Sequence, residues 1–348
     1  MQSRWSRFSK FALAGTVSIL LASFFPSPFP EELSSDVAAL TTKSESALGV
    51  YDPDRAFDRS EDVLIEHHFV TWRPDNADEL IVALDRAKQA NRLPMITLES
   101  WPWEWNGMGR ETLLQDIVAG KYDPTLRRIF QVIQQQSPQP ILIRWGHEME
   151  IVGQYPWSTD NPKAYIAAYR YIVDFARETG TDNLVWVWSP AGNKTAQKYW
   201  PGKSYVDAIG ISIYANKAWN YKNQQKVPSF KQLLLEKYWL VKRYQEPLIA
   251  AEVGVAGTKA EKEQWIADAM QTLPSFTEIK AWIYFNQVQP DIVPLPIGQP
   301  HWELDRDRIA LLLHHWQKIS NRSLSPQTID EYFSQESSHS PASKQSKR

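Results

Sequence analysis

The feature of this sequence that most constrains its fold is an eightfold recurrence of short apolar or aromatic runs, with helical periodicity in the stretches between them. The runs are Ala47–Tyr51, Val63–Trp72, Pro94–Glu99, Ile141–Arg144, Leu184–Trp188, Ala208–Tyr214, Leu248–Val253 and Ala281–Asn286. Their centres lie roughly 20 to 45 residues apart, a spacing that suits repeated strand–helix units. Continuous apolar runs of this kind are typical of strands buried on both faces of a parallel sheet.

Apolar residues at helical spacing occupy most of the intervening stretches. The expected helices are Asp78–Asn91, Pro124–Gln135, Pro162–Glu178, Phe230–Tyr244, Ala260–Thr272 and Asp305–Lys318. Eight such units predict an α/β fold, the (β/α)8 TIM barrel. The alternative is a doubly wound open sheet, but its glycine-rich phosphate turn, G-x-G-x-x-G, does not occur in this sequence.

The N-terminal segment has the pattern of a targeting sequence. Arg4, Arg7 and Lys10 precede an uncharged apolar stretch over residues 11–25, and prolines follow it. This pattern predicts that residues 1–30 are a signal peptide or an N-terminal membrane anchor. We therefore expect a protein that is secreted, periplasmic or attached to the cell envelope, the anchor providing membrane attachment if it is retained.

The rest of the chain divides by composition into three parts. Residues 31–47 are polar and are expected to be a linker, and residues 48–320 carry the strand–helix repeat of the barrel domain. Residues 321–348 are rich in Ser, Gln and Lys, which predicts a polar, disordered tail.

Composition excludes several classes of function. The chain has 38 Lys and Arg residues against 40 Asp and Glu residues, so it lacks the excess of positive charge with which proteins bind nucleic acid. The absence of cysteine excludes disulfides, thiolate metal sites and a cysteine nucleophile. His67 and His68 are neighbours in a strand and point to opposite faces, which argues against a shared metal. Sixteen tryptophans are more than a core requires, and they indicate a surface that stacks on a ligand.

Two glutamates stand at the ends of apolar strand patterns, where a charge is costly to bury unless it is paired or functional. Glu148 and Glu252 are 104 residues apart, three strand–helix units, so they can meet across the mouth of a barrel, where catalytic residues gather. Strand alternation places Arg144, Gly146 and Glu148 on one face. Arg144 can keep a neighbouring carboxylate ionised, while a second carboxyl near aromatic rings and that negative charge retains its proton.

Two carboxyl groups with different proton affinities are what the cleavage of a glycosidic bond requires. The structural alternative is a buried ion pair between Arg144 and Glu252, with Glu148 capping a loop. Sugars stack their C–H faces on indole rings, so tryptophans at the strand ends favour the catalytic interpretation. Candidates for such a rim are Trp101, Trp103, Trp105, Trp157 and Trp188, whereas Trp145, Trp186, Trp265 and Trp316 are expected to pack in the core.

The sequence Arg144–Met149, followed by Tyr155–Ser158, resembles the signature of glycoside hydrolase family 26, and Ala250–Gly254 adds a second, less specific match. The resemblance covers residues 48–318. It implies a retaining (β/α)8 hydrolase; most members of the family are β-mannanases, and some are β-1,3-1,4-glucanases or β-1,3-xylanases. Where the family usually continues with Asn-Gly, this chain has Glu150-Ile151.

The resemblance also implies roles for individual residues. Glu148 would be the general acid/base and Glu252 the nucleophile of a double displacement, with Arg144 supporting the charge of the nucleophile. Further contacts to the nucleophile or the sugar would come from Tyr214, from His147 and from an aromatic platform at Tyr284.

We therefore expect a monomeric endo-β-1,4-mannanase that hydrolyses O-glycosyl bonds of a polysaccharide with no metal or organic cofactor and no nucleic-acid partner. A β-1,3-1,4-glucanase or β-1,3-xylanase on the same fold is one alternative. The alternative of another class is a non-catalytic polysaccharide-binding barrel.

Overall fold

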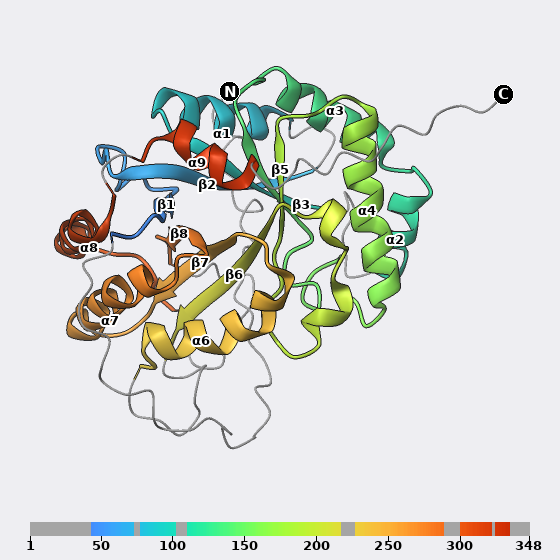
Figure 1. The fold of residues 1–348 in the computed structure, drawn as a ribbon. Helices are drawn as coiled ribbons and strands as arrows, with labels where there is room; N and C mark the ends of the chain where they lie inside the picture. Colours follow the sequence, from blue (N-terminus) through green and yellow to red (C-terminus); the bar gives the residue numbers. More distant parts are fainter. Residues whose placement is uncertain are drawn as a thin grey trace, which may run out of the picture.

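Eight parallel strands close into a single barrel in the order of the chain (Figure 1). The structure, a computed structural model, describes residues 43–72, 77–101, 110–216, 227–288, 300–321 and 324–334. The strands are β1 Ala47–Tyr51, β2 Val63–Thr71, β3 Leu93–Glu99, β4 Ile141–Trp145, β5 Leu184–Trp188, β6 Ala208–Ala215, β7 Leu248–Val255 and β8 Ile279–Phe285. Pairing of β1 with β8 completes the ring, so the predicted (β/α)8 fold is confirmed.

Helices surround the barrel on its outside (Figure 1). They are α1 Ala77–Gln89, α2 Arg110–Val118, α3 Asp123–Gln134, α4 Pro162–Glu178, α6 Phe230–Val241, α7 Lys259–Thr272, α8 Arg306–Ile319 and α9 Pro326–Ser334. Several begin at a side chain that accepts a backbone N–H of the first turn, among them α6 at Ser229, α7 at Thr258 and α8 at Asp305. The six helices expected from the sequence are present, and α2 and α9 are additional.

The strands are buried on both faces, which explains their continuous apolar runs. Side chains that point inward, such as Ile65, Met95 and Ile249, fill the barrel. Those that point outward, such as Leu48 and Ile143, pack against the helices.

The last helix corrects the expected domain boundary. Ile329 and Phe333 of α9 are buried in the same cluster as the inward-facing residues of the barrel. The expectation of a disordered tail is therefore wrong for residues 326–334, because an apolar pair at i, i+4 gives this polar segment one face that packs. Residues 335–348 lie outside the described residues.

The N-terminal boundary also moves slightly. Ser44 forms a bridge with Ser320, and its backbone N–H donates to the carbonyl of Ile319 at 2.7 Å, so the end of the expected linker belongs to the barrel. The predicted signal or anchor segment lies outside the described residues. Among the helices that the structure does describe, none has both the length and the apolar character needed to cross a bilayer.

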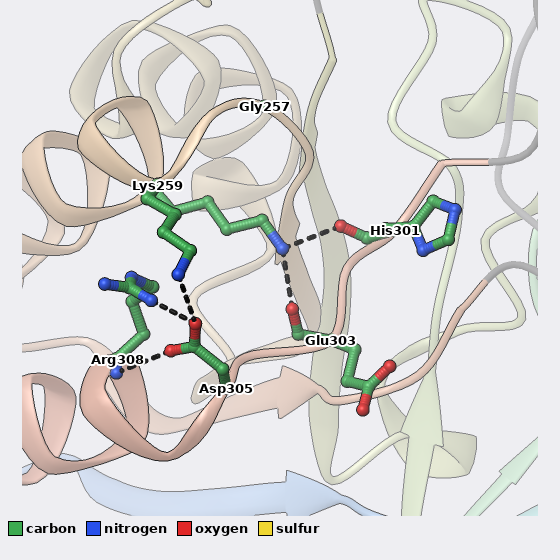
Figure 2. A pocket seen from close by; sticks show the side chains of 7 residues that line it. Gly257, Lys259, His301, Glu303, Asp305 and Arg308 are labelled. Atoms are coloured by element: carbon green, nitrogen blue, oxygen red, sulfur yellow. Dashed lines mark hydrogen bonds and ion pairs between the residues drawn. The ribbon is translucent and has the colours of Figure 1, made fainter.

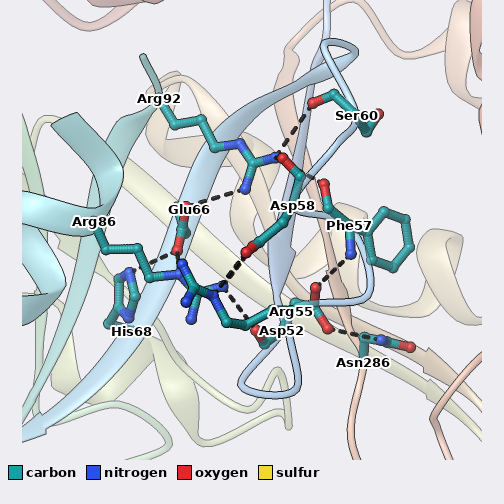
Figure 3. A network of polar contacts seen from close by, with 10 residues as sticks. All are labelled: Asp52, Arg55, Phe57, Asp58, Ser60, Glu66, His68, Arg86, Arg92 and Asn286. Carbon is teal, nitrogen blue, oxygen red and sulfur yellow. Dashed lines mark hydrogen bonds and ion pairs between the residues drawn. The ribbon is translucent and has the colours of Figure 1, made fainter. Parts of the chain in front are cut away.

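A polar network covers the outer face of β2 (Figure 3). Buried Glu66 forms ion pairs with Arg86 and with Arg92, the latter at 3.1 Å, and lies 3.3 Å from the imidazole of His68. Arg92 also donates to the carbonyl of Phe57 at 2.8 Å. Burial alone would raise the pKa of Glu66, but the hydrogen bond and charge of His68 and the two arginines outweigh it and lower that pKa below its ordinary value. This glutamate therefore has a structural role.

Candidate active site

Glu148 is positioned by a turn that follows β4. The strand ends at Trp145, and both Gly146 and Glu148 have positive φ, at 62° and 53°. A Cβ at Gly146 would lie 3.0 Å from the ring of Tyr165, so glycine is required there for space as well as for conformation. Strand alternation therefore applies to Arg144 but does not extend to Glu148. A left-handed glutamate costs about 1–2 kcal/mol, a strain that is concentrated at functional sites.

Two hydroxyl groups donate to the side chain of Glu148. Ser212 on β6 reaches Oε1 at 3.1 Å, and Tyr155 reaches Oε2 at 3.3 Å. Tyr155 is itself stacked on Trp157, with ring centroids 4.8 Å apart, and the indole of Trp157 donates to the carbonyl of His147 at 2.7 Å. The carboxyl group is thus oriented by a rigid aromatic wall.

Glu252, near the end of β7, is held by a cation and a phenol. The guanidinium of Arg144 forms a buried ion pair with Oε1, and the hydroxyl of Tyr214 donates to Oε2 at 2.7 Å. Arg144 is fixed in turn by Thr97 at 2.8 Å and lies over the ring of Phe69. Charge-assisted hydrogen bonds of this kind are strong and directional, so they hold the carboxyl group in one orientation. The contacts that the resemblance implies for Arg144 and Tyr214 are present.

The two glutamates converge over the same segment of β6. Ser212 donates to Glu148 and is also the register partner of Glu252 in the β6–β7 pairing. Burial raises the pKa of Tyr214 well above its ordinary value, and the charges of both glutamates add to this effect. The carboxyl ends of β4 and β7 therefore bring both carboxyl groups near the hydroxyl of Tyr214, each with its own hydrogen-bond partners.

His147 lies beside this pair with unused hydrogen-bonding capacity. It is buried, and within the described part of the chain neither ring nitrogen has a hydrogen-bond partner. Burial, together with the charge of Arg144, lowers its pKa well below the ordinary value, so the imidazole is neutral. Its rim position agrees with the expected contact to sugar hydroxyls, a role that stays a prediction.

The expected tryptophan rim is present only in part. Trp101 lies at the site, where its indole N–H donates to Oε2 of Glu99 at 3.1 Å. Trp157 lies in the wall behind His147, so its role in sugar binding stays a prediction. Trp103 and Trp105 lie outside the described residues.

Two expected sugar-binding residues face the wrong way. Trp188 is buried outside the barrel, against Trp200 and Tyr244. Tyr284 also points outward and donates to the carbonyl of Trp302 at 2.7 Å. These two expectations are wrong because alternation in a doubly buried strand shows which residues share a face but not which face is inside.

Other residues at the mouth were not singled out by the sequence. Tyr51, Phe69 and Phe285 form an inward aromatic cluster, with the Tyr51 ring 5.0 Å from Phe69 and 4.8 Å from Phe285. Glu99 follows the inward-facing Thr97 by two positions on β3. Alternation from the polar Thr97 would have identified Glu99, whereas the apolar run of β8 does not mark Phe285 as inward-facing.

A separate hollow of about 290 Å³ lies near the N-terminal ends of α7 and α8 (Figure 2). It is lined by Gly257, Lys259, Lys262, His301, Glu303, Asp305 and Arg308. Lys262 donates to the carbonyls of His301 and Glu303, and burial lowers its pKa to about 8. Neither Glu148 nor Glu252 lines this hollow. Within the described ranges, His, Asp and Glu side chains nowhere gather in a group of three or more that could hold a metal ion.

A closed (β/α)8 barrel with two buried glutamates at the carboxyl ends of β4 and β7 has the architecture of the glycoside hydrolases that use paired carboxyl groups. Residues 116–288, about half of the chain, match the model of Glycosyl hydrolase family 26. The chain belongs to this family, and the resemblance found in its motifs is confirmed.

Individual relatives agree with this membership. Endoglucanase H of Acetivibrio thermocellus is 29% identical over 262 residues, which are 71% of this chain and 27% of that protein. A mannan endo-1,4-beta-mannosidase of Bacillus subtilis is 31% identical over 129 residues, which are 33% of this chain and 35% of that protein. This chain thus spans about a quarter to a third of the length of these relatives. The solved structure of a family 26 β-mannanase from Bacteroides ovatus has the same fold, with a TM-score of 0.56, 13% identity, and coverage of 81% of this chain and 87% of that one.

Proposed function

We propose that the protein is a retaining glycoside hydrolase that cleaves a β-linked polysaccharide, acting as an endo-β-1,4-mannanase. The observation that carries this proposal is the unequal environment of the two glutamates. Glu252 is paired with Arg144 and Tyr214, whereas Glu148 accepts from the neutral hydroxyls of Ser212 and Tyr155. One carboxyl group is thus suited to attack and the other to proton transfer.

The mechanism follows from these roles. Glu252 attacks the anomeric carbon of the bound sugar while Glu148 gives a proton to the departing glycosidic oxygen. Glu148 then takes a proton from a water molecule, and that water releases the sugar from Glu252 with retention of configuration. This sequence requires the two carboxyl groups to stand about 5–5.5 Å apart. Arg144 and Tyr214 orient Glu252 for the first step, and they hold the carboxylate again when the second step releases it from the sugar.

The choice of mannan is supported by the mannosidase relative and by the family. A β-1,3-1,4-glucan is the second candidate substrate, and one observation favours it. The alignment to the endoglucanase covers 71% of this chain, against 33% for the mannosidase.

The proposed location is the cell exterior, the periplasm or the cell envelope, and the proposed state is a monomer. The basic and apolar pattern of residues 1–30 supports the location. N-terminal sequencing of the mature protein from fractionated cells tests whether this segment is removed or retained.

A reducing-sugar assay on purified mannan, lichenan and β-1,3-xylan tests the function. We expect the greatest release from mannan, with products whose anomeric configuration, followed by NMR, matches that of the substrate. The Glu252→Gln variant is the matched control and should release no sugar. Binding without release on every polysaccharide would instead identify a non-catalytic barrel.

A further inference from the structure

A third glutamate lies at the mouth of the barrel and has no place in the double displacement. Glu99 ends β3 and is buried on the inner face, two positions after Thr97, which contacts Arg144. Glu99 lies within electrostatic range of Tyr51 of β1, and its own ionisation is influenced by Arg144 of β4 and Glu252 of β7. From β2 its register partner is Thr71. Glu99 therefore faces the space in front of the proposed nucleophile.

Only one of the two oxygens of Glu99 is satisfied by the described residues. Oε2 accepts the indole N–H of Trp101 at 3.1 Å. Oε1 is buried and has no hydrogen-bond partner within the described part of the chain. A buried oxygen without a partner costs about 1–3 kcal/mol, so its retention at an active site points to a ligand that completes it.

The protonation state of Glu99 follows from its surroundings. Burial raises its pKa to about 8, although Trp101 and Arg144 act in the opposite direction. The Arg144 guanidinium is already paired with Glu252, so a second carboxylate nearby would lack a counter-charge of its own. Because Oε2 is the acceptor for Trp101, the proton belongs on Oε1, the oxygen without a partner.

We propose that Glu99 is a substrate-binding residue that donates a hydrogen bond from Oε1, as a neutral carboxylic acid, to a hydroxyl group of the sugar held against Glu252. The inference rests on the proposed function, because it assumes that a sugar occupies this space. The neutral hydrogen-bond donor of Glu99 would let the site distinguish a sugar that has a hydroxyl group opposite Oε1 from a sugar that lacks it.

A thermodynamic cycle on affinity tests the inference without depending on turnover. The full chain carries Glu148→Gln to block hydrolysis, and calorimetry gives the dissociation constants for mannose- and glucose-based β-trisaccharides and their monodeoxy analogues. In this background Glu99→Gln preserves a neutral donor and acceptor, and we expect its affinities to stay within about 3-fold of the parent. Glu99→Leu is neutral but cannot donate, and we expect affinity to fall about 10- to 100-fold.

The decisive result is the response to one missing hydroxyl. Removing that hydroxyl should weaken binding to the parent and to Glu99→Gln, but leave binding to Glu99→Leu unchanged. Equal losses in all three proteins would overturn the inference, as would a Glu99→Gln variant as weak as Glu99→Leu, which would mean that Glu99 acts as an anion. Glu66→Gln, a buried glutamate on the outer wall, is the control for general destabilisation and should leave every affinity unchanged. If the unmodified protein releases no sugar from any polysaccharide, the proposed function fails, while this cycle still decides the role of Glu99.

Discussion

Glu66 and Glu99 lie on neighbouring strands of the barrel, and both are buried, yet their pKa values move in opposite directions. Glu66 faces outward into a network of two arginines and a histidine, which lower its pKa (Figure 3). Glu99 faces inward, where burial dominates and raises its pKa to about 8. The barrel wall therefore separates two environments for the same side chain.

The difference shows how a single sheet can combine stability with chemistry. On the outer wall the buried charge of Glu66 has three partners, Arg86, Arg92 and His68, and its cost of burial is offset locally. At the inner mouth Glu99 accepts a hydrogen bond from a neutral indole and Glu148 accepts from two neutral hydroxyls, and both lie where substrate binding and proton transfer are proposed.

The largest effect is expected for the two inner glutamates. Glu252→Gln should lower kcat by at least about 10⁴-fold, because the nucleophile is lost. Glu148→Gln should lower it by about 10²–10⁴-fold, the usual contribution of a general acid/base. Glu148→Gln should unfold within a few degrees of the parent in a thermal melt, whereas Glu252→Gln also removes the counter-charge of buried Arg144 and should unfold at a lower temperature. Wild-type turnover in either variant would contradict the proposed mechanism.

On the outer wall the effect should be on stability. Arg92→Met leaves the buried Glu66 short of one partner and should lower the free energy of unfolding by about 3–5 kcal/mol, measured in urea. The kcat of the folded enzyme should stay unchanged.

Arg55→Met is the matched control in the same network. Arg55 is 62% exposed and pairs with Asp58 at 2.7 Å, so the loss should be below about 1 kcal/mol. Equal losses for the two arginines would remove the distinction between buried and exposed pairs.

The contributions of Glu99 and Glu66 to the free energy of unfolding should also change in opposite directions with pH. Folded Glu99 keeps its proton up to a pKa of about 8, against 4.5 for the ordinary side chain, so folding takes up a proton between these values. The free energy of unfolding of the wild type should therefore fall, relative to Glu99→Gln, by up to about 1.4 kcal/mol per pH unit as the pH rises through this range.

For Glu66 the pKa is lowered, so the stability it contributes is present above its ordinary pKa and is lost as the pH falls through its folded value. Urea unfolding across the range from acid to mildly alkaline pH measures both slopes. The free energy of unfolding of the wild type minus that of each variant gives the contribution of one glutamate. If this difference changed with pH in the same direction for Glu99→Gln and for Glu66→Gln, the contrast between the inner and outer faces of the barrel would be refuted.

The smallest expected effect concerns the indole that orients Glu99. Trp101→Phe removes the hydrogen bond to Oε2 but keeps an aromatic ring, so kcat/KM should fall by roughly 5-fold, equivalent to about 1 kcal/mol. Trp239→Phe on α6, where the side chain is 56% exposed, is the control and should leave kcat/KM unchanged. A similar loss in both variants would show that Trp101 does not act through Glu99.

The sequence predicts the barrel well because each buried parallel strand leaves an apolar run that needs no tertiary information. The ion pair between Arg144 and Glu252 is also predictable, since a charge inside an apolar strand requires a partner. The location of Glu148 depends on left-handed backbone at Gly146 and Glu148, which no strand pattern encodes.

The expectations that fail share one physical cause. Trp188 and Tyr284 sit on strands that are apolar on both faces, so alternation alone does not assign the inner face. In such strands an inward-facing residue can be recognised from the sequence only when a polar residue two positions away marks the inner face, as Thr97 does for Glu99. Helix α9 is not predicted from the sequence, because its segment is mostly polar and packs on the barrel through the apolar side chains of Ile329 and Phe333.

The position of α9 has a consequence for synthesis on the ribosome. The apolar interior at one end of the barrel is covered by Ile329 and Phe333, and the bridge between Ser44 and Ser320 joins the segment before β1 to the end of α8. These covering residues are translated after all eight strands, so the nascent chain keeps an exposed apolar opening until residues 326–334 have emerged from the ribosome. The barrel can therefore be covered only after α9 has been synthesised, and until then its apolar interior depends on protection from aggregation.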